Sequence, residues 1–278
     1  MKPTILITAP QHYSSRLEAS FKRYQDQVSV VHIPMVQSTF ATNNKQMQEL
    51  CTHLHEYDFV VCLSRKAIDA MHYYGHNHDD LTQTQFLAIG KDNDYLQDKL
   101  GVTPPFIAEE SSPLGIAQAL EARGFTKGCR IAALSPAFVD LEEPQTVPVF
   151  IKRLKELNID VQRIDAYVNM ASELSERKKA YDLIIDQQIS TVVFTSGSEV
   201  VAFKEGLEEV YGTDADSVLE LIDVACMGPY TAAQAKLIGL KVDKIPTKFH
   251  SFDDLTAYLI ASKHLNAQAA FSLGIGGH

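Results

Sequence analysis

The chain has 278 residues, of which 45% are hydrophobic and 22% charged, and its formal net charge is −10. This length allows two domains of ordinary size, and the composition is that of a globular protein. An acidic chain with no run rich in lysine and arginine is a poor candidate for nucleic-acid binding. No stretch approaches the roughly 20 apolar residues that span a bilayer. We therefore expect neither nucleic acid nor a membrane as a partner.

The four cysteines, Cys51, Cys62, Cys129 and Cys226, lie far apart and form no CxxC pair. Three of them stand in apolar, strand-like surroundings, which predicts buried free thiols. The first residues enter a strand-like segment directly and show no signal-peptide pattern. These features predict a cytoplasmic protein without disulfides.

Short apolar runs alternate with helical segments along the whole chain. Helical patterns cover residues 14–25 and 47–57, and the polar stretch 212–217 is expected to be a loop. Buried strands alternating with helices predict an α/β protein whose parallel sheets are covered on both faces. The expected strands are residues 4–9, 28–34, 58–64, 85–90, 130–135, 160–168, 191–196 and 222–228.

The two halves of this pattern repeat each other. Residues 57–71 (YDFVVCLSRKAIDAM) correspond to 189–203 (ISTVVFTSGSEVVAF), and residues 86–102 correspond to 224–240. Gly90 and Gly101 have the same spacing as Gly228 and Gly239. The repeat predicts two related α/β domains, and the space between two domains is a common place for a ligand.

These segments carry a family resemblance. Residues 192–203, 225–259 and 154–169 (LKELNIDVQRIDAYVN), in this order and spacing, resemble the uroporphyrinogen-III synthase family. The resemblance extends from the first strand to about residue 262 and implies two flavodoxin-like parallel-sheet domains with a cleft between them. It places residues 1–33 and 169–278 in a discontinuous first domain and 37–163 in the second, with linker strands at 34–36 and 164–168.

The resemblance also implies a reaction. The substrate is hydroxymethylbilane, a linear tetrapyrrole with carboxylates on every ring. The enzyme, a cyclising hydro-lyase of heme biosynthesis, closes it with loss of water and inversion of the last ring. Orientation of a flexible substrate would then be the main catalytic contribution. The implied protein needs no metal or organic cofactor and is a monomer that makes at most transient contact with the preceding pathway enzyme.

Gly228–Thr231, between a strand and a helix, is the first candidate for substrate binding. Backbone N–H groups and the helix dipole favour a carboxylate at such a turn. Pro229 and Tyr230 would occupy the first helical positions, and Thr231 would offer a hydroxyl. An ordinary turn with a capping group is the alternative, but open α/β sheets bind ligands at the carboxyl ends of their strands.

The preceding strand end offers hydroxyls and amides from Thr195, Ser196, Gly197 and Ser198. A helix cap formed by Ser196 or Ser198, with Glu199 in the first turn, is compatible with carboxylate binding at the same place.

The matching turn of the other half contains Ser64, Arg65 and Lys66. The resemblance implies a basic residue here, and either Arg65 or Lys66 would pair with a substrate carboxylate. A solvated basic pair is the alternative that the sequence leaves open.

The resemblance implies a proton donor at Tyr167, which would protonate the leaving hydroxyl. A phenol with its ordinary pKa near 10 can donate a proton at neutral pH but is a poor base. Packing of the ring at the predicted linker is the structural alternative.

Other patterns are weaker. His72, His76 and His78 lie close together, but no carboxylate or cysteine stands at a spacing diagnostic of a metal site, and we expect none. Ala9, Leu63, Asn93 and Tyr230 replace polar or charged residues that are common in the family. These departures keep a second hypothesis open, a non-catalytic tetrapyrrole-binding or regulatory relative. A two-domain protein that binds small anions is a third.

Overall fold

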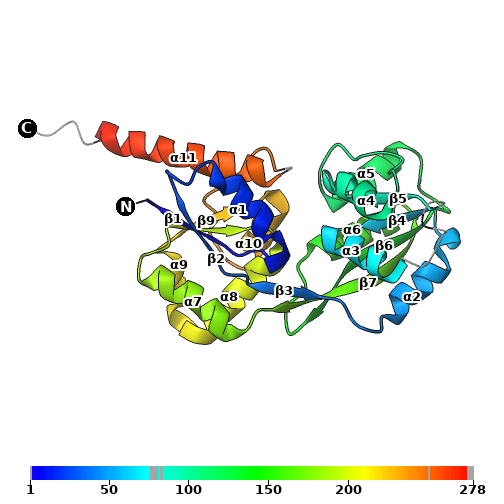
Figure 1. The fold of residues 1–278 in the computed structure, drawn as a ribbon, viewed down its shortest axis with the longest axis horizontal. Coiled ribbons are helices and arrows are strands. Elements are labelled where there is room, and N and C mark those ends of the chain that lie inside the picture. The colour runs from blue at the N-terminus through cyan, green and yellow to red at the C-terminus, as the bar shows by residue number, and fades with distance from the viewer. Residues whose placement is uncertain (1, 76–80, 82–83, 250, 274–278) are drawn as a thin grey trace, which may run out of the picture. The chain divides into compact units, whose positions relative to one another are not determined.

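The computed structural model describes residues 2–75, 81, 84–249 and 251–273, with side chains up to Ser262. Internal contacts divide the chain into two compact units. Unit 1 comprises Met1–Gln37 and Ala171–His278, and unit 2 comprises Ser38–Met170. Each unit contains one β-sheet with helices packed against it (Figure 1).

The sheet of unit 1 has the strand order β2-β1-β8-β9, and all its pairs are parallel. Its strands are β1 (Thr4–Ile7), β2 (Ser29–His32), β8 (Thr191–Phe194) and β9 (Asp223–Cys226). Its helices are α1 (Ser14–Lys22), α7 (Leu174–Ile185), α8 (Gly197–Tyr211), α9 (Ala215–Leu219), α10 (Pro229–Leu237) and α11 (Phe252–Leu273).

Opposite faces of this sheet carry different helices. Ile5 and Ile7 of β1 pack with Leu17 of α1 and with Leu259 of α11 in one buried cluster. On the neighbouring strand, Phe194 meets Phe203 of α8 edge to face, with ring centroids 5.3 Å apart. Because successive side chains of a strand point to opposite faces, this alternation explains why strands β1, β8 and β9 are buried on both sides.

The sheet of unit 2 has the order β3-β7-β6-β4-β5, in which the pairs β4–β5, β4–β6 and β6–β7 are parallel. Its strands are β3 (Val36–Thr39), β4 (Phe59–Cys62), β5 (Phe86–Ala88), β6 (Arg130–Val139) and β7 (Asp160–Ala171). Its helices are α2 (Lys45–Thr52), α3 (Arg65–Gly75), α4 (Asp92–Leu100), α5 (Pro113–Ala122) and α6 (Thr146–Glu156).

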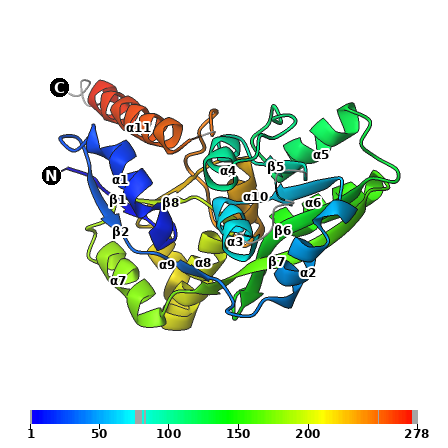
Figure 2. The same ribbon diagram turned by 45° about the vertical axis from the view of Figure 1, so that its right-hand side comes forward.

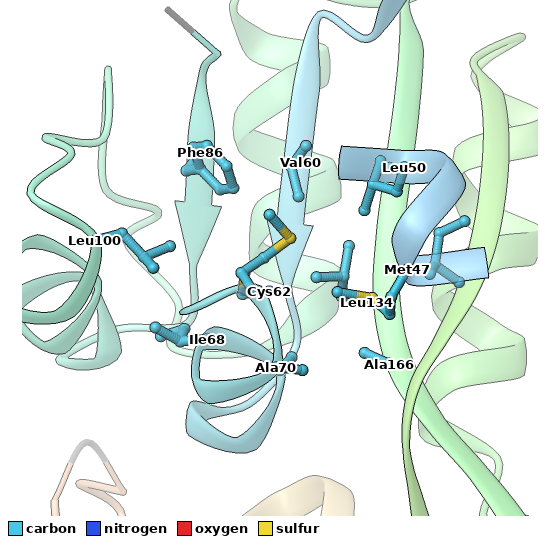
Figure 3. Packing of buried hydrophobic residues seen from close by; sticks show 14 of the residues in the cluster. Met47, Leu50, Val60, Cys62, Ile68, Ala70, Phe86, Leu100, Leu134 and Ala166 are labelled. Atoms are coloured by element: carbon cyan, nitrogen blue, oxygen red, sulfur yellow. The ribbon is translucent and has the colours of Figure 1, made fainter. Parts of the chain in front are cut away.

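Helices α2, α3 and α4 cover one face of this sheet (Figures 2 and 3). Val60, Cys62 and Leu134 of β4 and β6 contribute to this core, together with Met47 of α2 and Ile68 of α3. Helices α5 and α6 cover the other face with a second cluster of buried residues.

The two sheets share one topology. In unit 1 the first strand, β1, lies between the second, β2, and the third, β8. In unit 2, β4 lies in the same way between β5 and β6. This doubly wound arrangement of parallel strands confirms the predicted α/β class. It also gives each sheet a switch point, between β1 and β8 and between β4 and β6, where open α/β sheets bind ligands.

The structure corrects two details of the sequence-based expectation. Residues 212–217 were expected to form a loop that caps a helix at Asp214 or Ser217. They contain a 3₁₀ turn at Gly212–Asp214 and the start of α9, whose N-cap is Asp214, so the loop was wrong and the cap position at Asp214 was right. The first predicted linker strand, residues 34–36, overlaps β3 only at Val36, and the rest of β3 was not expected because VQST lacks an apolar run. Residues 164–168, the second of the predicted linker strands, lie within β7.

Candidate functional site

The turn from β8 into α8 is organised around the carboxyl group of Glu199. This side chain is completely buried and stands at the third position of the helix. Its Oε1 accepts hydrogen bonds from Thr195 Oγ1 at 2.5 Å and Ser196 Oγ at 2.9 Å. Its Oε2 accepts from Thr195 N at 2.8 Å and lies 2.7 Å from Thr8 Oγ1. The carboxyl therefore ties the end of β1 to the end of β8, at the switch point of unit 1.

These bonds determine what the turn offers to a ligand. Ser196 is the N-cap of α8, but its side chain makes no capping bond to a backbone N–H, because it donates to Glu199. The prediction of Ser196 as the helix cap, with Glu199 in the first turn, is confirmed for the N-cap position, and Ser198 lies inside the helix. Gly197 and Ser198 follow as the first two helical residues, whose N–H groups precede the helical hydrogen-bond ladder.

Burial raises the pKa of Glu199, and the hydrogen bonds from Thr195, Thr8 and Ser196 act in the opposite direction. Cys226, on the adjacent β9, is also buried, and desolvation raises its pKa to about 12. Both groups therefore favour their neutral forms more than they would in water.

The turn from β9 into α10 has the predicted helical start. Gly228 is the N-cap and Pro229 the first helical residue. Ala232 N donates to Gly228 O at 3.1 Å, so the N–H groups of Tyr230 and Thr231 precede this first helical bond. The Thr231 side chain is buried, and its Oγ1 donates to Thr195 O at 3.4 Å. The hydroxyl expected to face a ligand thus links the two turns of unit 1.

Gly228 is required by a close contact and not by its backbone angles, since its φ of −168° is ordinary extended backbone. A Cβ atom on Gly228 would lie 3.0–3.1 Å from ring atoms and Cβ of Phe249. The aromatic ring therefore covers this turn. Gly90, which has the corresponding place in unit 2, has a different need, because its φ is +50°.

In unit 2, the residue that ends β4 contacts the predicted proton donor. Ser64 Oγ lies 2.9 Å from Tyr167 Oη, and it also accepts a hydrogen bond from Ala67 N at 3.1 Å. Ser64 thereby caps α3 and holds the phenol at the start of this helix. Tyr167 is buried in the core shared with α2 and α3. Desolvation raises its pKa to about 12, although the bond with Ser64 acts in the opposite direction.

The two basic residues of this turn have different roles. Arg65 Nε donates to Asp92 Oδ1 at 2.7 Å, and its guanidinium lies 4.6 Å from the centre of the Tyr95 ring. Arg65 thus joins α3 to α4. The ammonium of Lys66 lies 4.0 Å from the centre of the Phe40 ring, and burial lowers the pKa of this lysine. Within the described parts of the chain, no carboxylate forms an ion pair with Lys66.

Asn93, one of the departures from the family, has a local structural function. Its amide nitrogen donates to Ala88 O at 3.0 Å and to Gly90 O at 2.7 Å, and its oxygen accepts from Ala88 N at 3.1 Å. Asn93 is buried and satisfies the backbone of the turn between β5 and α4.

Fold and site together define a doubly wound α/β protein in which both units have helix N-termini and hydroxyl groups at their switch points. The family model of uroporphyrinogen-III synthase HemD matches residues 15–256. The chain therefore belongs to the uroporphyrinogen-III synthase family.

One solved structure agrees on the fold. A mutant uroporphyrinogen III synthase from the extremely thermophilic bacterium Thermus thermophilus matches with a TM-score of 0.63 and 13% identity, covering 96% of this chain and 99% of that one. A second structure of the Thermus thermophilus enzyme matches at 13% identity with a TM-score of 0.44, covering 94% and 100%. No curated protein sequence matches the chain.

Other expectations have mixed outcomes. All four cysteines are buried and free, as predicted. His76 and His78 lie outside the described residues, and the described part of the chain contains no group of side chains that could hold a metal ion. Among the described helices, none combines the length and apolar character needed to cross a membrane.

Sequence reasoning did not assign a role to Glu199, Thr8 or Phe249. The spacing of Ser196 and Glu199 is that of a capping box, S-x-x-E, which was the available signal for Glu199. Thr8 and Phe249 act over large sequence separations, and no local pattern indicates their contacts.

Substitution of Gly228 by alanine tests the cover on the β9–α10 turn. The added methyl group would press on the Phe249 ring, and we expect a loss of roughly 1–3 kcal/mol in the free energy of unfolding, as in other overpacked sites. In a Phe249→Ala background the same change should cost much less. A double-mutant cycle by thermal unfolding measures this coupling, and equal costs in both backgrounds would contradict the contact.

Proposed function

We propose that the chain is a uroporphyrinogen-III synthase that cyclises hydroxymethylbilane with inversion of the last ring. The observation that carries this proposal is the Ser64–Tyr167 pair at the start of α3, which presents a protonated phenol at the switch point of unit 2. Membership of the family supports the substrate class. We also propose a cytoplasmic location, in keeping with four free cysteines.

The substrate carboxylates are held by backbone N–H groups at the starts of α8 and α10, contributed by Gly197, Ser198 and Thr231. Helix N-termini favour anions through their dipoles and their unpaired N–H groups. Such local donors decide binding even in a chain with a net charge of −10, because salt screens distant charges beyond about 8 Å.

Tyr167 donates its proton to the leaving hydroxyl. The C–O bond then breaks, water leaves, and the electron-deficient carbon that remains is attacked by a carbon of the last ring to form the spiro intermediate. After rearrangement one proton is lost, which restores the phenol, so that the overall products are the cyclic tetrapyrrole and water. Since the pKa of Tyr167 is about 12, it is a weak acid, and orientation of the substrate provides most of the acceleration.

The reaction itself is the first test. Freshly prepared hydroxymethylbilane is supplied to the purified protein, and the isomers formed are separated by chromatography. We expect the type III isomer at a rate above spontaneous closure. If only the type I isomer appears, at the spontaneous rate, the synthase proposal is wrong. Binding of the tetrapyrrole without turnover would support the non-catalytic alternative.

Tyr167→Phe removes the proton donor and keeps the ring packed in its core. We expect the turnover number for type III product to fall about 10–100-fold, at or below the low end of general-acid effects, with KM nearly unchanged. Tyr57→Phe, at a half-buried tyrosine of the same unit whose hydroxyl donates to Gln162, is the matched control. Full turnover by Tyr167→Phe would remove this residue from the acid role.

Substitutions of Lys66 and Arg65 are expected to have different effects, the first on substrate binding and the second on stability. Lys66 is the cation that we assign to a substrate carboxylate, so Lys66→Met should raise KM about 10-fold or more, as expected when a charged hydrogen bond is lost. Arg65→Met should instead lower the melting temperature, because it breaks the link to Asp92. Lys127→Met, at the amino end of β6, is the control for net charge. A larger KM effect for Arg65→Met than for Lys66→Met would reverse the assignment.

A further inference from the structure

Thr8 lies between two oxygen atoms at hydrogen-bond distance. Its Oγ1 is 2.8 Å from the carbonyl oxygen of Val193 and 2.7 Å from Oε2 of Glu199. The Thr8 side chain is completely buried. A hydroxyl has one proton, and neither a carbonyl nor an ionised carboxylate has a proton to donate. If Glu199 were ionised, the single proton of the Thr8 hydroxyl could serve only one of these two contacts. The other contact would then have no proton between its two oxygen atoms.

A protonated Glu199 satisfies every contact of this cluster. Its Oε2–H donates to Thr8, and Thr8 donates to Val193 O. The second lone pair of Oε2 accepts from Thr195 N, while Oε1 accepts from the hydroxyls of Thr195 and Ser196. We propose that Glu199 is a positioning residue of the unit 1 anion site and that it acts as the neutral acid.

This arrangement specifies how the site recognises a carboxylate. The hydroxyls of Thr195 and Ser196 use their protons on Glu199, so they present only lone pairs to a ligand. A carboxylate at this turn is therefore bound by the backbone N–H groups of Gly197 and Ser198. A neutral Glu199 avoids placing a negative charge one helical turn from the bound anion. This inference rests on the proposed carboxylate-binding function of the turn.

The surroundings support a neutral form. Thr8, directly after β1, and Thr195, directly after β8, bring no charge to the carboxyl. Cys226 on β9 is the titratable neighbour that interacts electrostatically with it, and Lys236 on α10 acts on Cys226. Burial raises the pKa of Glu199 in agreement with the proton count.

The first experiment compares binding of uroporphyrin III, an octacarboxylate, by fluorescence titration. Glu199→Gln is neutral and of the same length, and its amide can still donate to Thr8 and accept from the two hydroxyls. It loses only the acceptor for Thr195 N, so its Kd should remain within about 3-fold of the wild type. Glu199→Asp cannot reach the same donors and should weaken binding at least 10-fold. In turnover, KM should follow these changes while kcat stays nearly constant. If Glu199→Asp fails to fold, Ser196→Ala, which removes one donor to Oε1, should still weaken binding several-fold.

The second experiment measures the melting temperature between pH 5 and 9. A carboxyl whose pKa is raised on folding contributes full stability below its unfolded pKa, near 4.3, and loses it as the pH rises through the folded value. The melting temperature of Glu199→Gln should therefore increase relative to the wild type as the pH rises. Glu220→Gln, at an exposed glutamate, should show no such trend.

The outcomes are distinct. Loss of binding by Glu199→Gln equal to that of Glu199→Asp, or a pH-independent difference in melting temperature, would overturn the neutral positioning role. Absence of type III product would refute the proposed function, yet the binding and melting comparisons would still decide the role of Glu199.

Discussion

In each sheet, two neighbouring parallel strands are followed by helices on opposite faces, so neither helix covers the strand ends. Strand β1 leads toward α1 on one face of unit 1, while β8 leads into α8 on the other. Strands β4 and β6 of unit 2, followed by α3 and α6, repeat the arrangement. The backbone groups exposed at these points need partners. The chemistry of the whole candidate site follows from how the sequence provides them.

The two units provide hydrogen-bond partners for these backbone groups in different ways. In unit 2, Ser64 caps α3 with its own hydroxyl and shares it with Tyr167. In unit 1, the hydroxyl of Ser196 is turned away from the backbone and toward a buried carboxyl. An unpaired buried carboxyl would be costly, but the hydrogen bonds that it receives offset the loss of hydration. At the start of α8 the N-cap side chain therefore bonds no backbone N–H, whereas at α3 the N–H of the third helical residue, Ala67, donates to Ser64.

The sequence was sufficient to predict the architecture, because its short apolar runs indicate directly which segments are buried strands. Every expected strand is present, and Pro229 begins a helix as predicted. Strand β3 was missed because the polar residues of VQST pair at the edge of a sheet and need little burial. The roles of Arg65 and Lys66 were left open for another reason. Only the fold brings Asp92 and Tyr95 of α4 against Arg65, and Phe40 under Lys66.

The departures from the family pattern are less damaging than they look in the sequence. The side-chain amide of Asn93 makes hydrogen bonds to the backbone of its own turn, between β5 and α4. Tyr230 stands where threonine is usual in the family, and it occupies the second position of α10, directly after Pro229. The proposed site, built from main-chain donors at the starts of helices, would tolerate such changes. The proposed orientation catalysis would depend more on where these backbone groups lie than on the identity of neighbouring side chains.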